Sequence, residues 1–329
     1  MYICKGVSAI KSFTITKNDA NQRLDKFISK AVPLLPQALM YKYIRLKRIK
    51  VNGKRAEIST RLMVGDTVDM YINDEFFAPS PVQYDFLRAS KHIDIVYEDE
   101  NIILLNKRVG MLCHPDGSEF VNTLIASVQR YLYEKGEYDP KGENSFAPAL
   151  ANRIDRNTCG IVICAKTAQA LRVLNQKIKD REISKFYLCI VHGTPRKKEA
   201  VLEGFLEKNE SKNKVFISGK KTADNRTILT KYRVIDSKNG FSLLEIDLLT
   251  GRTHQIRAHM ASIGHPLLGD GKYGQKEQNR GTGFKKQALC SYKLKFNFTT
   301  DGDVLEYLNG REFELDSVPF VEDFYNGKI

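Results

Sequence analysis

A charged turn that runs directly into an apolar strand constrains this chain more than any other feature. Residues 152–160 read NRIDRNTCG and are followed by the β-type run IVICAK. Asp, Asn, Thr and Gly favour turns because their short side chains bond to nearby backbone or tolerate unusual backbone angles. Asp155 stands here between two arginines. The pattern predicts either a surface turn with Asp155 paired to Arg153 or Arg156, or a catalytic carboxylate on a loop supported by a rigid sheet.

The net charge of the chain indicates a polyanionic partner. Its 329 residues carry 52 Lys and Arg against 39 Asp and Glu, a formal charge of +13. Such an excess attracts nucleic acid or an anionic membrane surface. No apolar run approaches the about 20 residues that cross a bilayer, and the first residues lack the apolar core of a secretion signal. We therefore expect nucleic acid rather than a membrane as the partner. The length of the chain allows more than one domain.

The cysteines and histidines are not spaced as metal ligands. The six cysteines form no C-x-x-C pair, and three of them lie in apolar, strand-like surroundings. This usage favours buried thiols in a reducing cytoplasm over disulfides or a zinc site. His254 and His259 are five residues apart and have no acidic partner at ligand spacing. We expect no metal.

The sequence of the first third of the chain predicts a small, independent domain, which we place at residues 12–75. Amphipathic spacing predicts a helix from Asn21 that is ended by Pro33, and a second helix over 37–46. A Val-Asn-Gly hairpin and a strand over 67–72 follow. A segment reading APSPV then predicts an extended, semi-rigid linker.

Basic residues and tyrosines alternate within this unit. Seven basic residues fall within residues 42–55. The mixture suits phosphate contacts and stacking on unpaired bases, for which we select Lys42, Arg45 and Lys50. Taken alone, a solvated basic face is the simpler explanation of so short a run. The order of helix, helix, hairpin and strand nevertheless resembles the S-four-like RNA-binding domain, although Pro-Gln opens the second helix where that family commonly has Ser-Arg.

The remainder of the chain alternates strands and helices. We place the linker at residues 76–90 and a mixed domain at residues 91–329. The patterning predicts strands over 93–97, 102–107, 161–166, 185–193 and 241–249, and helices over 121–133, after an N-cap at Thr167, and after Thr253.

Four motifs in this domain resemble those of the RluA family of RNA pseudouridine synthases, in the same order. Residues 152–160 are similar to H-R-L-D-x-x-T-S-G, and residues 185–193 to K-x-Y-x-A-x-V-x-G. Residues 251–259 are similar to G-R-T-H-Q-[IL]-R-x-H and lead into HPLLGD. The first motif is matched by YED at 97–99 and K-x-x-G at 107–110. This chain has Asn for the leading His, Cys for the Ser, and Arg for the usual Pro after the lysine of the first motif.

The resemblance implies a fold and a reaction. The fold is α+β, with a mixed, mostly antiparallel central sheet and flanking helices, beside the small α+β S-four-like domain. The reaction breaks the C1′–N1 bond of a uridine in RNA, turns the uracil and joins C1′ to C5, so it needs neither cofactor nor metal. The implied partner is structured RNA, foremost large-subunit ribosomal RNA of the 23S type, and we expect a cytoplasmic monomer. A tRNA substrate, a non-catalytic RNA-binding protein and a metal-dependent hydrolase are the alternatives.

The resemblance also implies roles for individual residues. Asp155 matches the essential carboxylate, which attacks the ribose or the base or abstracts a ribose proton. Arg252 matches the arginine that pairs with this carboxylate, although by itself it would read as a helix-start arginine. Tyr187, otherwise a half-buried strand tyrosine, matches the residue that stacks on the target base and helps to remove the C5 proton. Arg153 matches the arginine that supports the flipped-out nucleotide, and Ile256 is a candidate apolar wall of the pocket.

Overall fold

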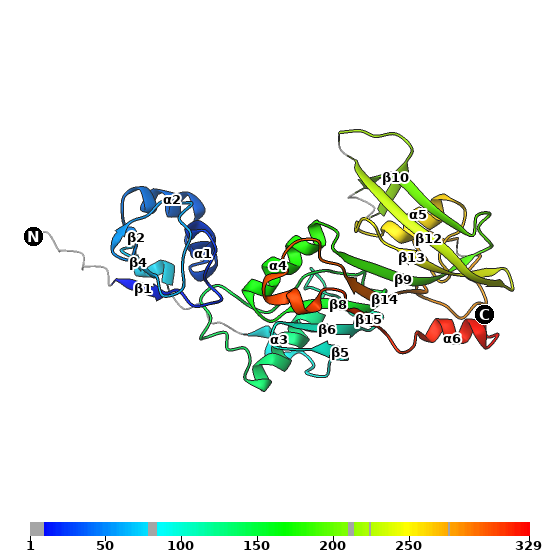
Figure 1. Cartoon of the computed structure of the whole chain (residues 1–329), viewed down its shortest axis with the longest axis horizontal. Coiled ribbons are helices and arrows are strands. Elements are labelled where there is room, and N and C mark those ends of the chain that lie inside the picture. The colour runs from blue at the N-terminus through cyan, green and yellow to red at the C-terminus, as the bar shows by residue number, and fades with distance from the viewer. Residues whose placement is uncertain (1–9, 78–83, 210–213, 224, 276) are drawn as a thin grey trace, which may run out of the picture.

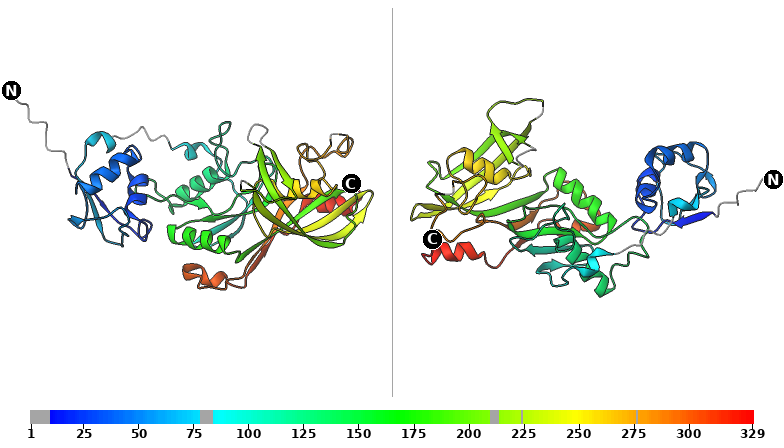
Figure 2. Two further views of the ribbon diagram at one scale, coloured as in Figure 1. Left: turned by 90° about the horizontal axis from the view of Figure 1, so that it is seen from above. Right: turned by 180° about the vertical axis from the view of Figure 1, so that it is seen from behind.

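The computed structural model describes residues 10–77, 84–209, 214–223, 225–275 and 277–329. Within these residues the strands form a four-stranded sheet near the amino terminus and an eleven-stranded sheet in the rest of the chain. Figures 1 and 2 show the small sheet and its helices at one end of the molecule and the carboxyl terminus toward the other.

The amino-terminal unit is an α+β layer with its own core. Its elements are β1 (Lys11–Thr14), α1 (Leu24–Ala31), α2 (Gln37–Arg45), β2 (Ile49–Val51), β3 (Lys54–Arg55) and β4 (Thr67–Met70), with sheet order β1-β4-β2-β3. Leu24, Phe27 and Met70 are fully buried in the core. The first helix begins at Leu24 rather than at the predicted Asn21, whose φ of 62° is incompatible with a helix.

The large sheet is antiparallel except at one pair of strands. Its order is β11 (Lys214–Ser218), β10 (Glu199–Asn209), β12 (Arg226–Lys238), β13 (Phe241–Asp247), β9 (Ile183–His192), β14 (Leu289–Phe296), β8 (Cys159–Ala165), β6 (Ile102–Lys107) and β5 (Ile95–Glu98), with β7 (Ala149–Leu150) on β8 and β15 (Glu312–Glu314) on β14. Only β14 and β8 run parallel among these pairs. This sheet and its helices confirm the predicted α+β class. Residues 199–238, for which the sequence motifs make no prediction, supply three of the strands.

Besides α1 and α2, the helices are α3 (Leu124–Lys135), α4 (Ala168–Lys179), α5 (Gln255–Ser262) and α6 (Pro319–Tyr325), with short 3-10 turns at Asp74–Phe77, Asp85–Arg88 and Asp303–Leu308. Threonine side chains cap the first turns of α3 and α4. The Thr167 hydroxyl accepts from the Ala170 N–H at 3.1 Å, as predicted for an N-cap. The helix predicted from residue 121 begins only after Thr123, whose hydroxyl caps it in the same way.

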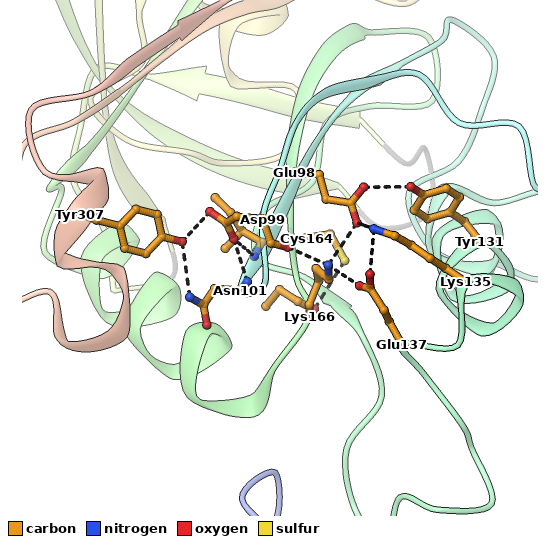
Figure 3. A network of polar contacts seen from close by, with 11 residues as sticks. Glu98, Asp99, Asn101, Tyr131, Lys135, Glu137, Cys164, Lys166 and Tyr307 are labelled. Atoms are coloured by element: carbon orange, nitrogen blue, oxygen red, sulfur yellow. Dashed lines mark hydrogen bonds and ion pairs between the residues drawn. The ribbon is translucent and has the colours of Figure 1, made fainter.

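A buried strand and a polar network position the turn that carries Asp155. Every residue of 161–165 in β8 is fully buried, which explains the continuous apolar run. Just beyond β8, Lys166 Nζ lies 3.1 Å from Glu98 and also contacts Glu137 (Figure 3). Lys135 on α3 reaches Glu98 at 2.8 Å. The network fastens one end of β8 to β5 and α3, while the Asp155 turn leads into the other end.

The structure also bears on the expectations for disulfides, metal sites, membrane spans and the linker. The five cysteines of the described part of the chain are free, and Cys4 lies outside it. Among the described residues, no group of three or more His, Cys, Asp or Glu side chains is placed to hold a metal ion. None of the described helices is both long and apolar enough to span a bilayer. In the expected linker, Phe76 and Phe77 pack against the amino-terminal core, and residues 78–83 lie outside the described residues.

Candidate active site

A cationic cavity of about 640 Å³ opens beside the turn that precedes β8. The end of α4, the start of β9 and the turn between β13 and α5 complete its wall. Among its lining residues, the acidic side chains are Asp155 and Asp247, and the lysines and arginines are Arg153, Lys179, Arg181, Lys185, Arg252 and Arg257. The excess of positive charge suits a ligand that carries phosphates.

The turn of residues 152–160 is fastened to the sheet by its own side chains and backbone. The Thr158 N–H donates to the Asp155 carbonyl at 3.0 Å and closes the turn. Asn152 Oδ1 accepts from the Ile163 N–H of β8 at 2.8 Å. The asparagine that stands in place of the motif's histidine therefore ties the turn to the strand.

The side chain of Lys107 and the close packing at Gly160 also fix the position of this turn. The ammonium of Lys107, which is completely buried, donates to the carbonyls of Arg156 at 3.1 Å and Met111 at 2.8 Å. Burial lowers the pKa of Lys107 to about 8. Gly160 has a φ of 110°, and a Cβ at this position would lie 2.2 Å from the Ser291 carbonyl oxygen. Only glycine fits so close an approach of β8 to β14.

Arg257 of α5 is the cation that pairs with Asp155. Its Nη1 lies 3.0 Å from Asp155 Oδ2, while its Nε and Nη2 donate to the two oxygens of Asp270 at 2.7 and 2.9 Å. The bidentate pair with the fully buried Asp270 fixes the plane of the guanidinium. Burial acts to lower the pKa of Arg257, but Asp270 and Asp155 together raise it above its ordinary value. The carboxylate of Asp155 thus faces a fixed positive charge.

The partner expected for Asp155 was a different arginine of the same motif. Arg252 is exposed at the turn before α5 and lines the cavity, but the ion pair is made by Arg257. Side chains on a helix lean toward its amino terminus, and this direction brings Arg257 toward the turn that carries Asp155. The alternative pairings are not formed among the described residues: Arg156 donates instead to the Gly110 carbonyl at 3.1 Å, and the exposed Arg153 lines the cavity.

The structure brings Tyr187 and Ile256 to the same cavity as Asp155. Tyr187 is only 5% exposed, and burial raises its pKa well above the usual range although Ser291 bonds to its hydroxyl. The amino-terminal basic residues selected from the sequence, Lys42, Arg45 and Lys50, do not line this cavity. Lys42 and Arg45 are exposed on α2, and Lys50 Nζ lies 5.1 Å from the centre of the Tyr71 ring.

His254 and Tyr273 extend the site beyond the residues expected from the sequence. His254 Nε2 lies 3.8 Å from Asp155 Oδ2, and its Nδ1 lies 3.0 Å from the Tyr273 hydroxyl. Its backbone is left-handed, with a φ of 55°, at the position just before α5, and its side chain lines the cavity. His254 stands in the motif of residues 251–259 and Tyr273 just after the HPLLGD segment that follows it, so the signal was present, but spacing alone weighed His254 only as a metal ligand.

Comparison with known proteins places these features in one family. A family model described as RNA pseudouridylate synthase matches residues 101–262, and an S4 domain model matches residues 22–68. The chain is 31% identical to an uncharacterized RNA pseudouridine synthase of Mycoplasma genitalium, over 94% of this chain and 97% of that protein. It is 30% identical to ribosomal large subunit pseudouridine synthase D of Borreliella burgdorferi, over 96% and 93%.

Two further comparisons agree with these. Ribosomal large subunit pseudouridine synthase C of Rickettsia conorii is 33% identical over 78% of this chain and 84% of that protein. Among solved structures, human RNA pseudouridylate synthase domain containing 4 superposes with a TM-score of 0.55 at 19% identity, covering 70% of this chain and 92% of that chain. The structural likeness shows the same fold.

Proposed function

Because the chain belongs to the RluA family of RNA pseudouridine synthases and carries an S4 domain, we propose that it converts specific uridines of large-subunit ribosomal RNA into pseudouridine. The observation that carries the proposal is the Asp155–Arg257 ion pair in the cationic cavity, with Arg257 held from behind by the buried Asp270. The fixed guanidinium orients the Asp155 carboxylate toward the cavity, where a carboxylate can act by nucleophilic attack or by proton abstraction. Two relatives are named for the large ribosomal subunit, which supports ribosomal RNA over tRNA.

The cavity residues divide the work of base flipping and chemistry. Extruding a base from its stack costs a few kcal/mol, so roughly that much must come from protein contacts. Arg153, exposed at the cavity, supports the displaced nucleotide, and the other cationic side chains of the lining bind neighbouring phosphates. Tyr187 and Ile256 form the apolar surface on which the uracil packs. Asp155 then acts on the ribose or the base.

Tritium release is the test of this activity. RNA carrying tritium at uridine C5 loses it to water when C1′ becomes bonded to C5. The purified protein should release tritium from ribosomal RNA, with full activity in the presence of a chelator. Absence of release from ribosomal RNA and tRNA alike would favour a non-catalytic RNA-binding protein. Pseudouridine mapping of total RNA from cells with and without the gene would then identify the uridine.

We also propose that the chain divides into an S4 domain at residues 12–75, a linker at 76–90 and a catalytic domain at 91–329. Lys42, Arg45 and Lys50 bind RNA in the first of these, because two of the three are exposed on one helix and the third lies on an adjoining strand. The free cysteines fit a cytoplasmic enzyme, and the proposed state is a monomer, which sedimentation would check.

Deletion of residues 1–75 is expected to weaken RNA selection and to leave the remaining domain folded. The S4 unit contacts the catalytic domain through polar side chains, such as Asp19 with Asn144 at 2.8 Å and with Ser145 at 2.6 Å. Among the described residues, its apolar core cluster includes none beyond Phe77, so the deletion uncovers Phe76 and Phe77 of the linker but not the core of the catalytic domain. Competition between a structured ribosomal fragment and an unstructured uridine-containing RNA measures the selection, and thermal unfolding measures the fold. Unfolding of the truncated protein would show that the proposed boundary is wrong.

A further inference from the structure

We propose that Arg181, at the end of α4, binds a backbone phosphate of the substrate RNA beside the uridine that enters the cavity. This inference rests on the proposed function, since it assigns a binding task at the same cavity. It is carried by three features: the backbone conformation of Arg181, the lack of a partner for its side chain among the described residues, and the ion pair that fixes the turn on which it stands.

Arg181 occupies a backbone conformation that most side chains avoid. Its φ is 64°, in the left-handed region. The N–H of Arg181 donates to the Ile178 carbonyl at 3.3 Å, and the N–H of Glu182 donates to the Lys177 carbonyl at 2.8 Å. These two bonds form the Schellman motif that ends many helices, and the left-handed residue of this motif is usually glycine because a Cβ is disfavoured there.

Among the described helices, α3, α5 and α6 end in the same way with glycine. In α3 the left-handed residue is Gly136, with a φ of 77°, and the same two bonds are made. Gly264 and Gly327 take this place at the ends of α5 and α6. None of these glycines lines the cavity. The end of α4 therefore departs from the pattern at the point where it borders the cavity.

Helix α2 also has a cation in the left-handed position. Lys47 has a φ of 59°, and the N–H of Arg48 donates to the Tyr43 carbonyl at 2.9 Å. Lys47 is exposed and follows closely after Arg45, which we propose to bind RNA. The two helix ends with a cation in place of glycine thus lie at the two surfaces assigned to RNA. This distribution is expected if the side chain contributes binding that offsets an unfavourable backbone conformation.

The guanidinium of Arg181 is available to a ligand. Among the described residues, no hydrogen bond or ion pair involves its side chain, which is exposed and lines the cavity that holds Asp155. In the same cavity, the guanidinium of Arg257 is instead occupied by Asp155 and Asp270. A guanidinium whose N–H donors are unused suits a bidentate contact with phosphate.

A buried ion pair fixes the turn that carries Arg181. Lys177 Nζ lies 2.6 Å from Glu182 Oε2, and both side chains are almost completely buried. Lys177 Nζ also donates to the Thr300 hydroxyl at 2.8 Å, and Glu182 Oε1 accepts from the Thr299 hydroxyl at 2.5 Å. These contacts tie the residues on both sides of Arg181 to the segment that follows β14. Because the backbone is fixed before RNA binds, a phosphate contact here costs little ordering of the turn.

Arg181→Gly tests the assignment, because binding and stability should change in opposite directions. Glycine relieves the left-handed conformation, so the melting temperature should stay the same or rise. Loss of one phosphate contact should weaken binding of large-subunit ribosomal RNA, transcribed in vitro, by roughly tenfold at low salt. The slope of log affinity against log salt should become shallower by about 0.7 to 0.9. Filter binding over a salt series measures both, and turnover at saturating RNA should stay near that of wild type.

Gly136→Arg is the matched control. It places the same side chain in the same backbone conformation outside the cavity, where an added Cβ meets no atom within 4 Å. This variant should lower the melting temperature by about 1–3 °C through the backbone alone and leave the salt slope unchanged. Arg181→Lys, which keeps the charge, should keep the wild-type slope.

The outcomes separate the explanations. An Arg181→Gly protein with the wild-type salt slope would overturn the inference. If its melting temperature also fell, the arginine would be stabilising the end of α4 through its charge instead. Lost turnover at saturating RNA with an unchanged slope would likewise overturn the inference, because Arg181 would then act in the chemistry. A wild-type protein that binds RNA and forms no pseudouridine in any RNA would remove the proposed function, while the salt slope of Arg181→Gly would still report on the phosphate contact.

Discussion

Asp155→Asn is expected to abolish pseudouridine formation while leaving RNA binding largely intact. The amide has nearly the shape of the carboxylate but neither attacks carbon nor accepts a proton at neutral pH. Loss of such a group costs on the order of 10⁴-fold or more in turnover. RNA affinity comes mainly from phosphate contacts, which the substitution leaves in place. Tritium release measures the first effect and filter binding at fixed salt the second.

A matched carboxylate outside the cavity provides the control. Asp85→Asn changes a side chain that is 56% exposed and does not line the cavity, so its activity should equal that of wild type. Substantial residual turnover in Asp155→Asn would remove the catalytic role of this aspartate. Joint loss of binding, activity and thermal stability would show that the turn has collapsed instead.

Arg257→Met is expected to cost both activity and stability. The substitution removes the cation from Asp155 and leaves Asp270, which is fully buried, without its ion-pair partner. Breaking a buried pair from one side typically costs about 3–5 kcal/mol of the free energy of unfolding. Thermal or denaturant unfolding measures that loss, and tritium release under conditions where the variant is folded measures activity.

A double variant separates the two consequences. Arg257→Met combined with Asp270→Asn removes the unpaired buried charge, so much of the lost stability should return while activity stays low. Arg252→Met, at the exposed arginine of the same motif, should weaken RNA binding with a smaller effect on turnover and little on unfolding. If the double variant regained activity, or if Arg252→Met lost as much turnover as Arg257→Met, the ion pair seen in the structure would not be the catalytic one.

The motif by itself does not determine whether Arg252 or Arg257 pairs with Asp155. Both arginines belong to one nine-residue motif, and each is a chemically reasonable partner for Asp155. The choice depends on the direction of helical side chains and on Asp270, which is brought beneath Arg257 by the chain that follows α5. Neither is visible in residue types and spacing.

The order of strands also lies beyond sequence patterning. Local signals predicted β6, the Thr167 cap of α4 and the strand that follows the Asp155 turn. They did not predict that β14, from residues 289–296, would lie between β9 and β8. That pairing joins segments about a hundred residues apart through backbone bonds that are the same for every residue type, so no local pattern encodes it.

The sequence by itself determined the family, through its four motifs, and the turn that carries Asp155, and the resemblance to that family pointed to Arg153, Tyr187 and Ile256 as site residues. The turn and strand predictions follow from local chemistry, because turn formers, strand alternation and motif spacing are properties of neighbouring residues. Only the tertiary structure decided that Arg257 makes the ion pair, that His254 lies 3.8 Å from Asp155, and that residue 160 approaches β14 too closely for any side chain. Those outcomes depend on burial and on distances between segments far apart in the chain, which exist only once the sheet is closed around the site.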